Sequence, residues 1–392
     1  MDLVIGQSGV GTSSVWLVVL GRAGRDVTSY LELENGVNGL PAGTTDDFFG
    51  WSSAQLLPNP SEGTRTIAIG SPWHSGKRGA VHLVDVRAEF PSPSPSPSTS
   101  PSPSPSSSPT PSPTPSVSPT PSVTPSSAAV GTVYDAVKVG NNQGGLPSGV
   151  IAAGDVFGEF IASIGDIDGD GIPDIAVGAQ RDDDGSITDS GAVYIMFMNS
   201  NRTAKGYQKI SATEGGASMD PTLDGWLGSY PCRLDQPSGD DGHLPRLVVG
   251  EILGDVGTIN TGRIWVLRLN VTGMVLHTQA IANGVGGLPF GTLGFDDFFG
   301  MSVSTDGGDI DRDGYNDILA AARGQDPGGD DLSALYVLFM HANDTVRTFT
   351  RISQAVGGGL VGLPSTVSFL GRGMAAIPPR SPGNPVDVAI GM

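Results

Sequence analysis

Two acidic segments of the chain carry carboxylates at alternate positions, a spacing that suits a hard cation. Each follows the pattern D-x-D-x-D-G-x-x-D, in which the glycine permits the sharp turn that gathers the side chains. Calcium takes about six to eight oxygen ligands, so a backbone carbonyl near Ile172 or Tyr315 would complement the carboxylates. Neither segment contains His or Cys, which argues against zinc. The sequence therefore predicts two calcium sites, with ligands from Asp166, Asp168, Asp170, Ile172 and Asp174, and from Asp309, Asp311, Asp313, Tyr315 and Asp317.

A solvated Asp/Gly turn is the alternative interpretation of one such segment, and two copies in the same frame favour the metal. Without a cation the clustered carboxylates repel one another, so calcium should fix the loop that joins two strands. Three corresponding segments have lost the acidic pattern and are expected to bind no metal: 56–65, 234–246 and 376–385.

The elements that must position these loops belong to a repeat. A Phe-Gly pair, or its degraded form, leads through the loop to a short apolar strand, and a second strand with aromatic residues follows, as at 193–197. A Gly-Leu-Pro element precedes the next pair. The repeat of about 70 residues has the length of one four-stranded antiparallel sheet, and the 58 glycines indicate many tight turns. The five pairs are Phe49-Gly50, Phe157-Gly158, Leu227-Gly228, Phe299-Gly300 and Leu370-Gly371.

The Phe-Gly pair, the acidic loop, Ala-Val-Gly-Ala at 176–179 and Gly-Ala-Val-Tyr at 191–194 together resemble FG-GAP repeats, as in the propeller of integrin alpha chains. The resemblance covers the chain outside one Ser/Pro-rich tract, and it is strongest at 157–198 and 299–340. It implies that each repeat forms a blade, that the blades close a ring, and that calcium lies in loops on one face. We therefore expect an all-β fold, a β-propeller of about five FG-GAP blades.

The two ends of the chain fall in the same strand of the repeat, at 3–6 and at 388–391. The terminal blades are therefore expected to be incomplete, or completed by another segment of this chain or of a neighbour. Exposed half-blades would present free strand edges, which natural proteins cover.

Residues 91–129 form a Ser/Pro-rich tract, which cannot build a helix or a sheet ladder and favours polyproline II. Three parts of the chain follow: a first propeller segment at 1–90, the linker at 91–129, and the remaining blades at 130–392. The tract lies within one hairpin, between the strand that ends at Val86 and the returning strand at 132–139. It either loops out and returns beside its origin, or it joins two neighbouring propellers by exchange, which builds filaments when the geometry does not close.

Sequence signals for glycosylation fall in the turns of three successive repeats. The sequons N-x-S/T begin at Asn201, Asn270 and Asn343, at the turn that the Ser/Pro tract replaces in another repeat. The tract resembles the hydroxyproline-rich glycoproteins of algal and plant cell walls, and an unmodified spacer is the alternative. That resemblance implies hydroxylation and O-glycosylation at prolines such as Pro93, Pro95, Pro97, Pro103, Pro105, Pro111, Pro113, Pro115 and Pro121.

Composition excludes several classes of partner. The net charge of −19 would repel phosphate backbones, so nucleic acid is not expected. No apolar stretch is long enough to cross a bilayer, and the first residues do not form a signal peptide, so any export signal has been removed or lies outside this chain. Cys232 is the only cysteine and is expected to be a small buried apolar residue.

The favoured function is an extracellular calcium-stabilised structural glycoprotein, a subunit of a fibre or matrix that assembles with neighbouring copies by exchange. The alternative is an integrin-like adhesion propeller that binds a protein or glycan ligand through exposed aromatic residues such as Trp51, Trp73 and Trp226, although packing between blades is their more ordinary role. An enzyme is not expected, because the five histidines occupy unrelated repeat positions and no nucleophile motif accompanies them.

Overall fold

The structure is a computed structural model of the chain. It describes the following residues, and all statements about the structure concern these alone: 2–7, 14–20, 27–34, 40, 48–56, 64–88, 131–216, 219, 224–236, 244–325, 333–353, 374–377 and 387–390.

The described residues form six antiparallel sheets, in each of which the strands lie in chain order. The first blade contains β4 (Ser53–Gln55), β5 (Thr64–Ser71), β6 (Ala80–Ala88) and β7 (Gly131–Gly140). The second contains β8 (Phe160–Gly165), β9 (Asp174–Ala179), β10 (Ala192–Met198) and β11 (Ala204–Ile210). The third contains β12 (Leu227–Leu234), β13 (Arg246–Glu251), β14 (Arg263–Leu269) and β15 (Val275–Ile281). The fourth contains β16 (Phe299–Ser304), β17 (Ile318–Ala322), β18 (Ala334–Met340) and β19 (Val346–Ile352).

Two smaller sheets accompany the four blades. One contains β1 (Asp2–Gln7), β2 (Ser14–Leu20) and β3 (Val27–Leu33), and the other contains β20 (Met374–Ile377) and β21 (Asp387–Ile390). The single described helix, α1 (His74–Lys77), is a short turn with two non-helical residues inside. Among the described residues, these two sheets contain three and two strands.

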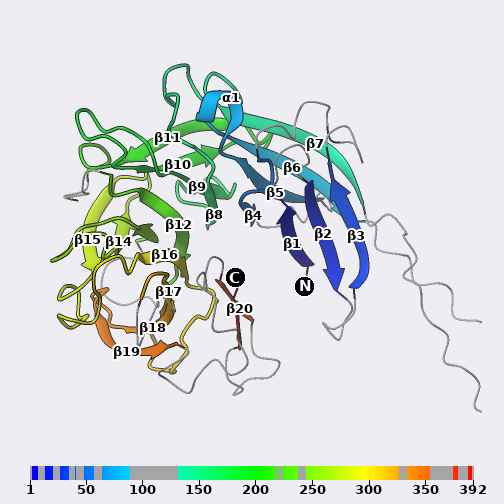
Figure 1. Cartoon of the computed structure of the whole chain (residues 1–392). Coiled ribbons are helices and arrows are strands. Elements are labelled where there is room, and N and C mark those ends of the chain that lie inside the picture. Colours follow the sequence, from blue (N-terminus) through cyan, green and yellow to red (C-terminus); the bar gives the residue numbers. More distant parts are fainter. Residues whose placement is uncertain are drawn as a thin grey trace, which may run out of the picture.

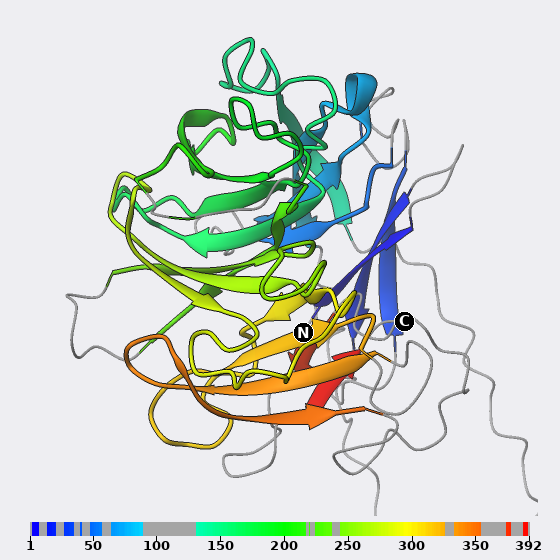
Figure 2. The same cartoon turned by 60° about the vertical axis from the view of Figure 1, so that its left-hand side comes forward.

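The sheets follow one another around a common axis, with their first strands innermost (Figure 1). β4, β8, β12 and β16 contact one another in that order near the centre, and the fourth strands lie at the outside (Figure 2 gives a second view). The apolar core consists of four clusters, each of which fills the space between two successive sheets. The expected all-β propeller fold is therefore confirmed.

The Phe-Gly pairs lie where one blade meets the next. Phe157 forms a parallel bridge with Gly79, which directly precedes β6 of the first blade, and its N–H donates to the Arg78 carbonyl at 3.0 Å. A Cβ on Gly79 would lie 1.9 Å from the Phe157 carbonyl oxygen, so only glycine allows this approach. The same bridge joins Leu227 to Gly191 and Phe299 to Gly262. The recurrence of the pair thus has a physical cause: it aligns each blade with its predecessor.

The aromatic ring of the pair packs on the third strand of its own blade. Phe157 and Tyr194 meet edge to face with ring centroids 5.5 Å apart, and Phe299 and Tyr336 repeat this geometry at 5.5 Å. In the first blade His82 takes the place of the tyrosine, 5.3 Å from Phe49.

The Gly-Leu-Pro element joins the outer strands of successive blades. Leu146 and Leu288 of this element are buried. The Gly144 carbonyl accepts a hydrogen bond from the N–H of Ala204, the first residue of β11, at 2.8 Å, and Gly286 binds Val346 of β19 in the same way. Phe-Gly contacts therefore link the four blades in succession, and Gly-Leu-Pro adds a second link between the first and second blades and between the third and fourth.

The strand after the Ser/Pro tract pairs with the strand before it. β7 runs antiparallel to β6, with Gly131 opposite Ala88 and Thr132 opposite Arg87. The strands on either side of the tract are thus antiparallel neighbours, and the placement of the linker at 91–129 within a blade hairpin stays a prediction. The tract itself, with the proposed hydroxyproline sites, lies outside the described residues.

The turns between third and fourth strands share one conformation in the other three blades. In each, the first residue's N–H donates to the fifth residue's carbonyl, as in Asn199 to Thr203 at 2.8 Å. The fourth residue has a positive φ and lies beside the preceding blade; these residues are Arg202 (67°), Gly273 (75°) and Asp344 (66°).

Candidate metal centres

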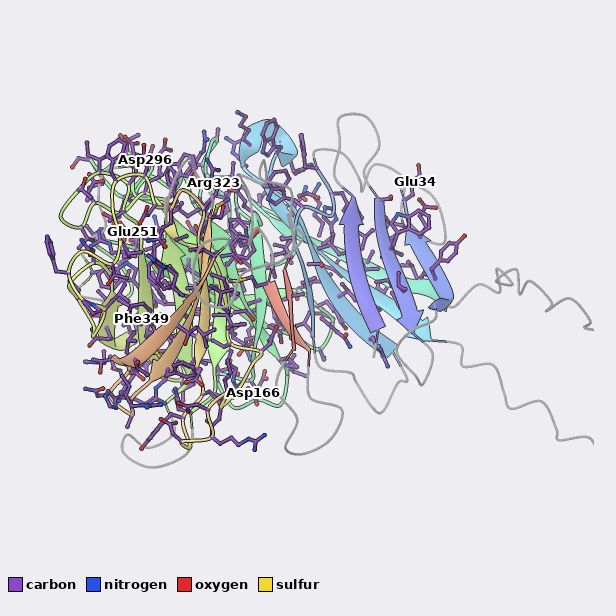
Figure 3. All side chains as sticks on the ribbon, turned by 60° about the horizontal axis from the view of Figure 1, so that its bottom comes forward. Glu34, Asp166, Glu251, Asp296, Arg323 and Phe349 are labelled. Atoms are coloured by element: carbon purple, nitrogen blue, oxygen red, sulfur yellow. The ribbon has the colours of Figure 1, made fainter. Side chains whose placement is uncertain are left out.

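Each acidic segment is the loop that joins the first and second strands of a blade. Loop one (166–174) leads from β8 into β9, whose first residue is Asp174, and loop two (305–317) connects β16 to β17. In loop one a carboxylate oxygen from each of Asp166, Asp168 and Asp174 lies within 4.8 Å of the others. Asp309, Asp311 and Asp317 form the same group in loop two, and the residues described include no further group of this kind. Figure 3 shows Asp166 at one end of the molecule and Asp296 at the opposite end.

The last aspartate of each loop is buried and held by two backbone groups. The Asp174 carboxylate accepts hydrogen bonds from the N–H of Ile167 at 2.9 Å and of Met198 at 2.9 Å. Burial, opposed by these bonds, raises the pKa of Asp174 to about 6, and burial raises the pKa of Asp317 in loop two to about 6 as well. A cation bound beside either carboxylate would favour its ionised form.

The first aspartate shapes the loop. The Asp166 carboxylate accepts hydrogen bonds from the N–H groups of Gly169 at 2.7 Å, Asp170 at 3.1 Å and Gly171 at 2.7 Å. Asp309 does the same for Asp313 at 3.0 Å and Gly314 at 2.9 Å in loop two. The glycine of the pattern adopts a positive φ in both loops, at 86° for Gly171 and 98° for Gly314, which explains why the pattern contains it.

The middle aspartates are paired with cationic side chains of the outer strand. Lys205 of β11 lies 2.7 Å from Asp168 and also contacts Asp170, and the hydrogen bond with Lys205 lowers the pKa of Asp170. In loop two, Arg347 of β19 lies 3.0 Å from Asp313 and also contacts Asp311. These partners could not be recognised from the sequence, because they follow the loops by more than 30 residues.

The expected ligands are therefore brought together only in part. Asp170 and Asp313 lie outside the close groups. Asp170 accepts a hydrogen bond from the Ile172 N–H at 2.8 Å, and Asp313 accepts one from the Tyr315 N–H at 3.0 Å. Ile172 and Tyr315 are the two residues whose carbonyl oxygens were expected to bind the metal. The donor set consists of oxygens alone, which fits calcium. One Asp168 oxygen is buried and has no hydrogen-bond partner, an arrangement that a cation would satisfy.

The acid-poor segments lie largely outside the described residues, namely 57–63, 237–243 and 378–386. The described part of the third-blade segment contacts loop two. The Gln236 side chain donates to the Asn316 carbonyl at 3.0 Å and accepts from the Asn316 N–H at 2.9 Å.

The sequons lie at the same end of the blades as the metal loops. In an antiparallel sheet whose strands lie in chain order, the connection from the first to the second strand and the connection from the third to the fourth strand are at the same end. Asn201 and Asn343 are exposed third residues of their turns. Asn270 belongs to the same turn but is its first residue, is half-buried, and accepts a hydrogen bond from the Met274 N–H at 2.9 Å. The sequence comparison of the repeats missed this two-residue offset, since only the turn's hydrogen bonds reveal it.

The aromatic residues singled out in the sequence lie at the opposite end. Trp73 is 42% exposed, with the Phe48 ring 4.5 Å and the Lys77 ammonium 4.8 Å from its ring centroid. Trp51 and Trp226 are half-buried, and the Arg181 guanidinium lies 4.9 Å from the Trp226 ring. All three are engaged in contacts within the protein, although Trp73 keeps a free face.

Cys232 is partly buried against the core between the third and fourth blades. Burial raises the pKa of its thiol to about 12, so it is an inert packing residue, as expected. None of the helical segments among the described residues has the length and hydropathy needed to cross a membrane.

A family model described as the FG-GAP repeat matches residues 157–196. The matched segment runs from the Phe157-Gly158 pair through loop one and β9 into β10. It coincides with one of the two stretches where the sequence most resembled this repeat. The four-stranded sheets of the described residues are consistent with a β-propeller of FG-GAP blades, and such repeats commonly bind calcium.

Proposed function

We propose that this protein is an extracellular, calcium-stabilised structural glycoprotein without catalytic activity, and a subunit of a fibre or matrix assembly. One observation carries the proposal: the acidic loops, the sequon turns and the hairpin that bears the Ser/Pro tract all open at the same end of the propeller. The bound calcium, the glycans and the Ser/Pro tract would then all lie at one end of the propeller.

Calcium would be held in loop one by Asp166, Asp168 and Asp174 and in loop two by Asp309, Asp311 and Asp317, in each case after the outer-strand cation has moved aside. Bound there, the ion would supply the positive charge that the clustered carboxylates lack. Because Asp174 also binds the Met198 N–H, the ion would tie the loop to the end of β10, directly before the turn that carries Asn201.

Assembly is proposed to use the β6–β7 ladder. The two strands pair over nine residue pairs, from Ala80 with Gly140 to Ala88 with Gly131. The intervening tract is long enough to let β7 and all later blades pair with the β6 of another copy. The same hydrogen bonds would then link two molecules, which is the exchange that builds filaments.

The test uses the full chain secreted from eukaryotic cells. We expect calorimetry to report two calcium ions per chain, and peptide mass spectrometry to find glycan at Asn201 and Asn343. Electron microscopy should show fibres that disperse when the tract is shortened. No calcium uptake together with unmodified sequons and a monodisperse monomer at high concentration would contradict the proposal.

A second candidate function, adhesion, is favoured by one feature of the opposite end. Phe290 is 82% exposed, and Phe295 and Ile259 are also largely exposed in two loops joined by the hydrogen bond from the Asp296 N–H to the Ile259 carbonyl. Binding to extracellular proteins or to a glycan array that is lost in Phe290→Ser, with the thermal midpoint unchanged, would support adhesion. Equal binding by the variant and the wild type would count against this surface.

A further inference from the structure

A basic side chain stands opposite each acidic loop, at one fixed position of the outer strand. Lys205 is the second residue of β11 and Arg347 is the second residue of β19. The two positions are equivalent, because Met198 pairs with Ala204 across the turn in the second blade, and Met340 pairs with Val346 in the fourth. Each basic residue contacts two aspartates of its own blade's loop.

The blades without an acidic loop have no cation at this position. In the third blade Leu269 pairs with Val275, so the equivalent residue is Leu276, which is 59% exposed. In the first blade Val86 pairs with Val133, which makes Tyr134 the equivalent residue. An exposed leucine on an outer strand shows that the position itself does not require a charge. A basic residue occupies this position only in the two blades, among these four, that have an acidic loop.

The contacts of these basic residues compete with the metal. Asp168 and Asp311 belong to the close carboxylate groups that calcium would occupy, and they are the same residues that Lys205 and Arg347 contact. An ammonium or guanidinium group and a divalent ion cannot both neutralise these oxygens at short range, since like charges repel strongly at such separations. Both side chains keep part of their surface in solvent, so they can leave the loop at low cost.

We propose that Lys205 and Arg347 are built-in counter-cations that neutralise the acidic loops in the absence of metal and are displaced by calcium. They keep each loop folded without the ion and lower the affinity for it, so the sites fill only at the high calcium concentrations found outside cells. This inference rests on the proposed calcium binding and concerns how the affinity of those sites is set.

The test is a calcium titration of the full chain by calorimetry, with thermal unfolding in chelator. Lys205→Met should tighten one of the two sites about tenfold and lower the thermal midpoint of the metal-free protein. Arg347→Met should do the same for the other site. The matched control is Leu276→Lys, which adds a cation at the equivalent position of the third blade and should leave both affinities within about twofold.

The outcomes separate the two proposals. Uptake by the wild type with unchanged or weaker affinity in Lys205→Met and Arg347→Met overturns the counter-cation role and leaves calcium binding intact. No uptake by the wild type or by any variant overturns calcium binding itself. Uptake by the variants alone supports the counter-cation role, because it means that the basic residue holds the wild-type site closed.

Discussion

Arg202 and Asp85 form an ion pair that crosses from the second blade to the first. Arg202 is the fourth residue of a sequon turn, and Asp85 is a fully buried residue of β6 that also accepts a hydrogen bond from the Thr66 hydroxyl at 2.6 Å. The position of Asp85 corresponds to Phe197 in β10 and to Arg268 in β14, because each directly precedes the register shift in the pairing of its strand with the outer strand.

The same two positions meet at each of the next two blade boundaries with complementary residues. Asp344 of the fourth blade binds Arg268 at 2.5 Å and Arg246 at 2.9 Å. At the middle boundary Gly273 faces Phe197, whose Cζ would lie 3.1 Å from a Cβ at Gly273. Charge is thus matched to the opposite charge, and a bulky ring is matched to the absence of a side chain.

We expect the opposite charges of Arg202 and Asp85 to stabilise the boundary between the first and second blades. Arg202→Asp should destabilise the protein by about 2 to 4 kcal/mol, because it leaves a buried carboxylate facing another acid. Arg202→Asp combined with Asp85→Arg should recover at least half of that loss in urea unfolding. Asp135→Asn is the control: this exposed acid lies 3.7 Å from Arg202, and its loss should cost less than about 0.5 kcal/mol. A double variant as unstable as the sum of the singles would argue against direct coupling.

Gly273→Ala should cost about 1 to 3 kcal/mol. The backbone φ of 75° strains any side chain, and the new Cβ would crowd Phe197 and Gln208. Gly149→Ala has a similar φ of 87° with no atom within 4 Å, so it reports the backbone strain alone. Equal losses for the two variants in thermal unfolding would show that the contact with Phe197 contributes nothing.

His82 should make the protein sensitive to acid. Burial above all, with the nearby charges of Lys138 and His74, lowers the pKa of His82 from 6.5 to about 3. Between these values the unfolded chain binds a proton that the folded chain does not, so stability falls as the pH drops from about 6.5 towards 3, by up to about 1.4 kcal/mol per pH unit.

The check is the pH dependence of urea unfolding for the wild type and for His82→Phe, which keeps an aromatic ring at a position where other blades have Tyr194, Trp265 and Tyr336. The difference in stability between the two proteins should change across this range and be flat above pH 7. Comparing the difference removes the opposite contributions of Asp155, Asp174 and Asp317, whose raised pKa values of about 6 favour the folded state on acidification. Parallel curves would refute a neutral buried His82.

Removal of calcium should lower stability through the acidic loops. At a concentration one hundred times the dissociation constant, each site would add about 2.7 kcal/mol. Asp168→Asn should abolish the gain from one site, because the asparagine has no charge and keeps only one of the two carboxylate oxygens. Asp224→Asn, an exposed acid outside the loops, should keep the full gain in the same thermal melts with and without chelator. A calcium effect that persists unchanged in Asp168→Asn would remove this residue from the site.

Replacing 89–130 by the five-residue turn 199–203 should leave the propeller folded. Ala88 and Gly131 already face each other as cross-strand partners, and shortening the loop lowers the entropy cost of closing the hairpin. We expect stability to be unchanged or raised by about 1 kcal/mol, while fibres disappear. Retention of fibres by the shortened chain would mean that assembly does not depend on exchange through the tract.

The blades could be predicted from the sequence because their determinants recur. The Phe-Gly pair recurs because each blade repeats the contact of Phe157 with Gly79, and the buried tyrosines recur for the same reason. The hairpin around the tract was predicted by aligning 132–139 with the other returning strands, and β6 and β7 are antiparallel neighbours in the described residues.

The features that could not be predicted are those that differ between blades. Arg202 and Asp85 are 117 positions apart, and their complementarity is visible only when both are known to face one boundary. Lys205 and Arg347 looked like ordinary surface charges of outer strands. The acidic loops could therefore be recognised from the sequence, but the basic residues that balance their charge could not.

The order of the strands gives the molecule a direction. Connections from first to second and from third to fourth strands all leave the sheets at one end, while those from second to third strands leave at the other. A blade can thus gain residues at one end with no change at the other, and the insertion of some forty residues between β6 and β7 is the largest instance. Insertions in the connections at one end can therefore add surface there, while the connections between second and third strands at the other end stay the same.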